Sequence, residues 1–146
     1  MNASNLIVAI DTREQKPYRF PRFEVKTLAT GDYSVVGLES QVAIERKTKE
    51  DAYASLGKGR GRFGRELKRL SQLDYAAIVI EASLPEFLEA PAYSHMNPKS
   101  AVNSIIAWSI KHRVPVFFAG DRLHGNALTL QLLKKFVRYR GGDPNV

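Results

Sequence analysis

The sequence contains no cysteine among its 146 residues, so neither a disulfide nor a thiolate-bound zinc ion can stabilise the chain. No apolar run approaches the roughly 20 residues that a membrane-spanning helix needs. The N-terminal residues are polar and lack the basic and apolar regions of a secretory leader. We therefore expect a cytoplasmic, nucleoid-associated protein with no membrane partner.

Several catalytic motifs are also missing. The phosphate-binding P-loop does not occur, and no Ser-His-Asp or Cys-His arrangement stands out. His95, His112 and His124 are isolated in the sequence, and none has the spacing of a metal ligand. We interpret these histidines as ordinary surface or capping residues.

The net charge of +7 arises from 22 Lys and Arg residues against 15 Asp and Glu residues. Because Lys and Arg release counterions when they bind phosphates, this excess favours a nucleic acid as partner. The alternative is a basic surface that only keeps the protein soluble. The length and the absence of repeats and linkers predict a single domain over residues 1–146.

Short apolar runs and amphipathic segments follow one another along the chain. The runs predict strands at residues 6–10, 32–36, 41–47, 75–80 and 114–118, and residues 24–28 alternate in the same way. Helical spacing predicts helices at residues 49–56, 65–73, 98–108 and 123–139. Residues 57–64 contain four glycines and are predicted to be a mobile loop. The pattern predicts an α/β fold with a mixed central sheet flanked by helices.

Two carboxylates and a lysine are predicted to meet in the hairpin of residues 32–47. Side chains alternate along a strand, so Glu45 and Lys47 share one side, while Ile44 and Arg46 share the other. The apolar residues mark the second side as the core, which places Glu45 and Lys47 in a cleft or in solvent. Asp32 begins the partner strand near their end of the hairpin. The alternative is a charged pair on a solvated face.

This group of side chains suits the hydrolysis of a phosphodiester. Mg²⁺ or Mn²⁺ prefers hard oxygen ligands and binds through one or two carboxylates together with a substrate phosphate. We therefore predict Mg²⁺ or Mn²⁺ as cofactor. Lys47 can orient the attacking water and stabilise negative charge.

The residues Gly31-Asp32, Glu45-Arg46-Lys47 and Asp51 resemble the GD–ERK–D motif of the XPF-family endonuclease domain, a branch of the PD-(D/E)xK restriction-endonuclease-like nucleases. Other parts of the first eighty residues are similar to the family in the same order. These parts are Asp11-Thr12-Arg13-Glu14 after the first strand, then Ser55, Arg62-Phe63 and Leu67-x-Arg69-Leu70, and last Ile78-Val79-Ile80-Glu81.

The resemblance implies a restriction-endonuclease-like fold and a metal-dependent endonuclease that cuts branched or single-strand/double-strand junction DNA, such as a flap or fork. It implies that Asp32 and Glu45 bind the metal and that Lys47 orients the water. Asp11 and Glu14 would lie at the rim as outer ligands or organisers.

Arg46 and Asp51 belong to the same motif. Because the alternation places Arg46 on the core side, we predict a buried guanidinium paired with an acid, with Asp11 or Asp51 as the candidates. Arg46 would then shape the catalytic site without touching the phosphate.

A basic stretch follows the motif and is predicted to contact DNA, although a solvated loop is the alternative. Its residues are Lys58, Arg60, Arg62, Arg65, Lys68 and Arg69.

XPF-family members usually carry a tandem helix-hairpin-helix domain after the nuclease domain. We expect a stand-alone form here, in which a helix-hairpin-helix protein or a helicase can supply DNA placement. The apolar stripe of the last helix, Leu128, Leu132, Leu133, Phe136 and Val137, suits either an intramolecular core or a homodimer, the form usual for such domains.

Two other functions compete with a junction endonuclease. One is a non-catalytic DNA-binding or scaffolding domain that positions an active partner, a role for which broken metal ligands would be expected. The other is a sequence-specific restriction-type endonuclease, which would need an inserted element that reads bases. The only segment available for such an element is residues 57–64.

Overall fold

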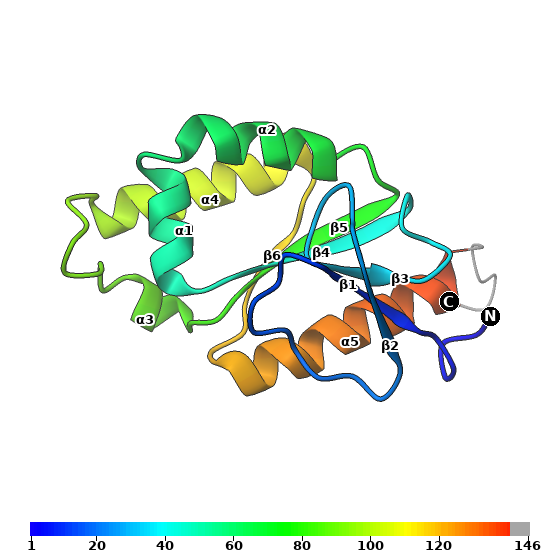
Figure 1. The fold of residues 1–146 in the computed structure, drawn as a ribbon. Coiled ribbons are helices and arrows are strands. Elements are labelled where there is room, and N and C mark those ends of the chain that lie inside the picture. The colour runs from blue at the N-terminus through cyan, green and yellow to red at the C-terminus, as the bar shows by residue number, and fades with distance from the viewer. Residues whose placement is uncertain (141–146) are drawn as a thin grey trace.

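Six strands form one mixed sheet in the order β2-β1-β3-β4-β5-β6 in the structure, a computed structural model that describes residues 1–140 (Figure 1). Strand β1 pairs parallel with β2 and antiparallel with β3, β3 pairs antiparallel with β4, and β5 pairs parallel with both β4 and β6. The strands are β1 (Val8–Asp11), β2 (Phe23–Lys26), β3 (Tyr33–Val35), β4 (Val42–Lys47), β5 (Tyr75–Ile80) and β6 (Val116–Phe118).

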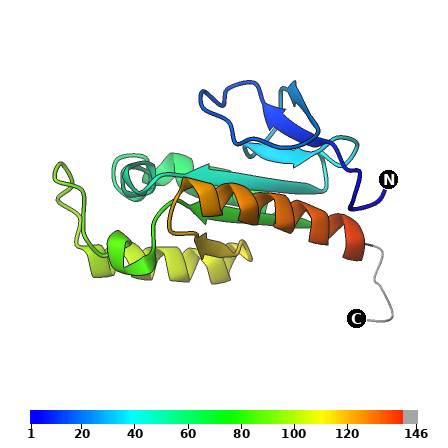
Figure 2. The same ribbon diagram turned by 90° about the horizontal axis from the view of Figure 1, so that it is seen from below.

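Helices cover both faces of the strands β4 and β5 (Figures 1 and 2). On one face lie α1, α2, α3 and α4, and on the other lies α5 with the segment that follows β1. The helices are α1 (Lys49–Leu56), α2 (Arg60–Leu70), α3 (Leu84–Phe87), α4 (Pro98–His112) and α5 (Arg122–Tyr139). The predicted α/β class with a mixed, helix-flanked sheet is therefore confirmed.

Most predicted elements occur within a few residues of their expected bounds. The first predicted helix begins as expected, with the Thr48 hydroxyl accepting a hydrogen bond from the backbone N–H of Asp51. The short helix α3 was not predicted, because its four residues are too few to show a helical period.

The prediction of a mobile loop at residues 57–64 is wrong for its second half, because α2 already begins at Arg60. Glycine disfavours a helix by about 1 kcal/mol relative to alanine, yet tertiary packing outweighs that cost here. Phe63 is 6% exposed and packs against Trp108, with ring centroids 5.5 Å apart. Phe63, Leu67 and Leu70 are all buried at helical spacing and hold the first turns of α2 on α4.

The alternation along β4 sends neighbouring side chains to opposite helical layers. Val42 and Ile44 belong to the core beside α5, whereas Ala43 belongs to the core beside α1, α2 and α4. Glu45 and Lys47 therefore point toward α1 and α2, and Arg46 points toward α5. Because helices cover both faces, the predicted cleft is confirmed and the solvated face is excluded for Glu45 and Lys47, whose side chains are 12% and 10% exposed.

The apolar stripe of α5 packs mainly inside the chain. Leu133 is fully buried and Val137 is 7% exposed, and the other members of the stripe are partly buried against the same core. The alternative of an intramolecular core thus accounts for the inner part of the stripe, and the homodimer stays a prediction. Among residues 1–140, no helix has both the length and the apolar character needed to cross a bilayer.

Gly31 occupies a position that only glycine fits, in the turn between residues 30 and 32. Its φ is +78°, and a Cβ there would lie 2.7 Å from the Cβ of Ala43. We expect Gly31→Ala to lower the free energy of unfolding by about 1–3 kcal/mol, as measured by urea denaturation.

Gly64→Ala is the matched control for this prediction. A Cβ at Gly64 meets nothing within 4 Å, and the residue lies inside α2. This substitution should raise the free energy of unfolding by about 0.4–1 kcal/mol, because it restricts the unfolded chain. Equal changes in the two variants would contradict the assignment of α2 and of the Gly31 turn.

Candidate active site

The candidate site lies where the ends of three strands approach α1 and α2. Asp32 directly precedes β3, Glu45 and Lys47 end β4, and Glu14 follows β1. They border an open cleft of about 590 Å³. The cleft is lined by Glu14, Asp32, Glu45, Arg46, Lys47, Asp51, Ala54, Ser55, Lys58, Gly59, Arg62, Phe63 and Glu66.

Backbone contacts hold Asp32 against the end of β4. Its N–H donates to the carbonyl oxygen of Ile44 at 2.9 Å, and its Oδ2 accepts a hydrogen bond from the backbone N–H of Arg46 at 2.7 Å. Its carbonyl oxygen accepts from the N–H of Asp11 at 2.9 Å. Asp32 is thereby fixed to both neighbouring strands, and its Oδ1 keeps its lone pairs for another partner.

Glu45 and Lys47 lie side by side in the cleft, as the alternation predicted. The Nζ of Lys47 is 3.8 Å from Oε1 of Glu45 and 4.9 Å from the centroid of the Phe63 ring. Lys47 is only 8% exposed in total. The ring of Phe63 favours the ammonium through its negative face and keeps water from one side of it.

The two carboxyl groups repel each other in a poorly solvated place. Burial raises the pKa of Asp32 to about 7, and the charges of Glu14 and Glu66 add to this shift, while the backbone N–H of Arg46 opposes it. Burial also raises the pKa of Glu45 well above its ordinary value. The charge of Asp32 and the contact with Glu66 on α2 raise it further. The nearby ammonium of Lys47 does not offset this excess of negative charge.

This donor set fits a divalent cation. Asp32 and Glu45 supply hard oxygen ligands, and a cation between them would remove the repulsion that raises both pKa values. Within residues 1–140, no group of three or more Asp, Glu, His or Cys side chains gathers as a complete metal cage. Two carboxylates completed by waters and a phosphate are the arrangement that Mg²⁺ accepts.

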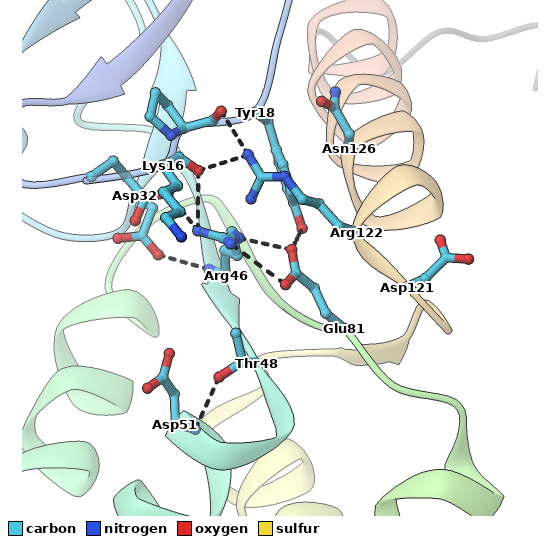
Figure 3. Close-up of polar contacts among 12 residues, drawn as sticks. Lys16, Tyr18, Asp32, Arg46, Thr48, Asp51, Glu81, Asp121, Arg122 and Asn126 are labelled. Carbon is cyan, nitrogen blue, oxygen red and sulfur yellow. Dashed lines mark hydrogen bonds and ion pairs between the residues drawn. The ribbon is translucent and has the colours of Figure 1, made fainter.

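Arg46 forms a half-buried ion pair on the opposite side of β4 (Figure 3). Its Nε donates to Oε2 of Glu81 at 2.8 Å, and its Nη1 lies 3.4 Å from Oε2 of Glu14. The prediction of a paired guanidinium on this side is confirmed. The predicted partners Asp11 and Asp51 are wrong. The partner is Glu81, because it directly follows β5, which pairs with β4 and ends beside Lys47.

Two tyrosines and a second arginine complete this network. The hydroxyl of Tyr18 donates to Glu81 at 2.6 Å, and the hydroxyl of Tyr33 donates to Glu14 at 2.6 Å. Arg122, at the start of α5, lies 5.1 Å from the centre of the Tyr18 ring (Figure 3). Its Nη2 donates to the carbonyl oxygens of residues 16 and 17, both at 2.8 Å. The network therefore links α5 to the end of β4.

Asp11 does not lie at the rim of the cleft, contrary to the prediction. It is 3% exposed, and its carboxylate accepts hydrogen bonds from Arg13 and from the backbone N–H of Leu28. These bonds outweigh the effect of burial and lower the pKa of Asp11. The other predicted rim residue, Glu14, does line the cleft, and so does Asp51, which is exposed in the first turn of α1.

The predicted DNA-binding residues divide into two groups. Lys58 and Arg62 line the cleft, and Arg65, Lys68 and Arg69 are exposed further along α2. Arg60 instead faces α4, where its guanidinium carbon lies 4.6 Å from the centre of the Trp108 ring and it contacts Ser104. Arg60 thus helps to pack α2 on α4.

The sequence reasoning missed Glu66, Glu81, Tyr18 and Tyr33 as members of the site. The segment Ile78-Val79-Ile80-Glu81 is similar to the family, and this likeness was the one sequence feature that pointed to Glu81. Glu66 lies one helical turn after Arg62, so both residues share a face of α2. With the start of α2 at Arg60 known, this spacing places Glu66 beside Arg62 at the cleft. The two tyrosines gave no local signal, because their partners are distant in sequence.

Fold and site together define an α/β domain with a mixed sheet, in which the carboxyl groups of Asp32 and Glu45 and the ammonium of Lys47 meet in one cleft. The chain belongs to the ERCC4 domain family, whose family model matches residues 10–132. The resemblance to the XPF-family nuclease domain is thereby confirmed.

Solved structures support the same fold. The chain is similar to XPF from Aeropyrum pernix, with 22% identity over 89% of this chain and a TM-score of 0.68. A second structure, of XPF from Aeropyrum pernix in complex with DNA, matches over 90% of this chain with 22% identity and a TM-score of 0.69. The matches cover 64% of each of those chains. No curated protein sequence matches the chain.

The raised pKa values of the acid pair predict how stability depends on pH. A carboxyl group whose pKa is higher in the folded state contributes stability that is present below about pH 4 and is lost as the pH rises through about 7. Without divalent metal, Asp32→Asn should therefore raise the melting temperature at pH 8 and leave it nearly unchanged at pH 4. Thermal unfolding followed by circular dichroism measures both values.

Asp121→Asn provides a control of opposite sign. The N–H and ring of His124 lower the pKa of Asp121 at the start of α5, so its contribution is present at neutral pH and lost in acid. This variant should melt at a lower temperature at pH 8. The assignment of Asp32 fails if Asp32→Asn also lowers the melting temperature there.

Proposed function

We propose that this domain is a metal-dependent endonuclease that hydrolyses phosphodiester bonds in branched or single-strand/double-strand junction DNA, such as a flap or fork. The observation that carries the proposal is the buried pair Asp32 and Glu45, with Lys47 beside it, in an open cleft. Membership of the ERCC4 domain family and the likeness to a structure of XPF in complex with DNA support it.

Each residue of the site has a distinct role in this proposal. Asp32 and Glu45 would hold Mg²⁺ or Mn²⁺, which when bound lowers the pKa of a water and offsets the negative charge of the phosphate. Lys47 would donate hydrogen bonds from Nζ to the attacking water and to a phosphate oxygen. Its place over the Phe63 ring fixes the direction of these bonds.

Arg46 would act from behind the site. Its backbone N–H holds Oδ2 of Asp32, and its side chain is occupied by Glu81 and Glu14 on the α5 side. It therefore positions the metal-binding carboxylate without contacting the DNA. Asp51 lines the cleft and is exposed, which suits an outer role through water.

The helix α2 offers a path for the DNA backbone that leads away from the cleft. Arg62, Arg65 and Arg69 follow at intervals of three and four residues, so they share one face of α2. Lys58, in the preceding turn, joins Arg62 at the cleft. From Arg62 to Arg69 the row extends for about 10 Å at the helical rise, which spans about three phosphates of one strand.

Partners other than DNA stay predictions. A homodimer would have to use the partly buried members of the α5 stripe or another surface, since Leu133 and Val137 are already in the core. A helix-hairpin-helix protein or a helicase would supply further DNA placement. The cytoplasmic, nucleoid-associated location depends on this role at DNA.

Cleavage of labelled 3′-flap, 5′-flap, fork and plain duplex DNA in Mg²⁺ or Mn²⁺ tests the proposal. We expect the branched substrates to be cut in preference to the duplex and the cutting to disappear with EDTA and in Asp32→Asn. Lys47→Ala should lower kcat by about 10²–10³-fold, because it removes a donor to the developing charge.

The scaffolding alternative gives a different result in the same assay. It predicts binding to the branched DNAs with no metal-dependent cutting by the wild-type protein. Asp121→Asn is a suitable control for the catalytic variants, because Asp121 caps α5 and does not line the cleft. Its cutting rate should equal that of the wild type.

Charge removal along α2 gives a separate prediction for DNA binding. Arg62→Gln, Arg65→Gln and Arg69→Gln should each weaken binding of fork DNA and reduce the slope of log K against log salt by about one. Arg60→Gln should leave that slope unchanged and lower the thermal stability, since Arg60 stacks on Trp108. Fluorescence anisotropy over a salt series measures the slope.

A further inference from the structure

Arg13 is an exposed arginine whose head group is nevertheless held in place. Its side chain is 70% exposed. Its Nε donates to Oδ2 of Asp11 at 2.8 Å, and its Nη2 donates to Oδ1 of Asp11 at 3.3 Å and to the carbonyl oxygen of Leu28 at 2.9 Å. Its Nη1 makes no hydrogen bond to the described residues, so two N–H donors stay available.

The residue that holds Arg13 is buried and dedicated to this purpose. Asp11 ends β1, is 3% exposed, and directs both carboxylate oxygens at Arg13 and at the N–H of Leu28. An ion pair with one exposed partner contributes little to stability. Fixing a long, flexible side chain also costs conformational entropy. The arrangement is therefore better suited to orienting a guanidinium than to stabilising the fold.

The position of Arg13 relates it to the cleft. Asp11, two residues earlier, binds the carbonyl oxygen of Asp32 through its N–H, and Glu14, the next residue, lines the cleft. After Asp11, the charges of Asp32 and Glu45 contribute to the raised pKa of Arg13. Arg13 thus directly precedes a residue that lines the cleft on the side of β1, whereas Lys58 and Arg62 line it on the side of α1 and α2.

We propose that the guanidinium of Arg13 binds a backbone phosphate of the DNA strand that enters the cleft, and that Asp11 is the residue that positions it. This inference rests on the proposed DNA-cutting function and adds a contact on a second side of the cleft. A planar guanidinium with two free donors matches the oxygens of a phosphate. Its fixed orientation lets it bind without losing further side-chain entropy.

The test measures DNA binding and does not depend on activity. Fork DNA is titrated over a salt series with protein that carries Asp32→Asn, so that the DNA stays intact. Arg13→Gln should weaken binding about five- to tenfold and reduce the slope of log K against log salt by about one. The matched control is Arg22→Gln, which removes the same charge beside the opposite end of β1 and should change neither quantity.

The role of Asp11 requires a further variant. Asp11→Asn keeps the charge of Arg13 but no longer holds its guanidinium. It should therefore weaken DNA binding when Arg13 is present and leave DNA binding unchanged when Arg13→Gln is also present. A merely structural role of Asp11 would produce the same loss in both backgrounds. If Asp11→Asn fails to fold, the comparison of Arg13→Gln with Arg22→Gln still tests the phosphate contact.

The outcomes separate this inference from the proposed function. If the Asp32→Asn protein binds the fork and Arg13→Gln binds as tightly as Arg22→Gln with an unchanged slope, the inference is overturned and the proposed function stands. If the Asp32→Asn protein and the wild-type protein without metal both fail to bind any branched DNA, both are overturned. A loss confined to Arg13→Gln supports both.

Discussion

The burial of the last three residues of β4 governs the rest of the site. Helices cover both faces of this strand, so Glu45, Arg46 and Lys47 are largely buried and their charges depend on partners within the chain. Alternation sends Glu45 and Lys47 to one layer and Arg46 to the other. The acid of the cleft and the ion-pair network of Arg46 therefore lie on opposite sides of a single strand.

The two sides of β4 differ in how far their charged side chains are neutralised. On the α5 side, Arg46 is paired with Glu81 and Glu14, and the hydroxyls of Tyr18 and Tyr33 donate to the same carboxylate oxygens, Oε2 of Glu81 and Oε2 of Glu14. On the α2 side, Asp32 and Glu45 keep an excess of negative charge that raises both pKa values. The α5 side is thus neutralised by its own ion pairs, whereas the α2 side keeps uncompensated negative charge.

The positive charge of the surface is arranged around this acidic centre. Lys58 and Arg62 line the cleft near α1 and α2, and Arg13 directly precedes Glu14, which lines it on the side of β1. The cleft therefore has positive side chains along its α1 and α2 side and an excess of negative charge at Asp32 and Glu45.

The sequence by itself determined the features that depend on local periodicity. The α/β class, the hairpin, and the shared side of Glu45 and Lys47 follow from a period of two along a strand. It could not determine which acid holds Arg46, because Glu81 is 35 residues away and becomes a neighbour only through the parallel pairing of β4 with β5. Nor could it predict that α2 begins among glycines, since the burial of Phe63 against α4 decides that start. Burial is a property of the whole fold, and it raises the pKa values of Asp32 and Glu45 and places Asp11 away from the cleft. The orientation of Arg13 depends on hydrogen bonds to Asp11 and to the carbonyl oxygen of Leu28, which is 15 residues away.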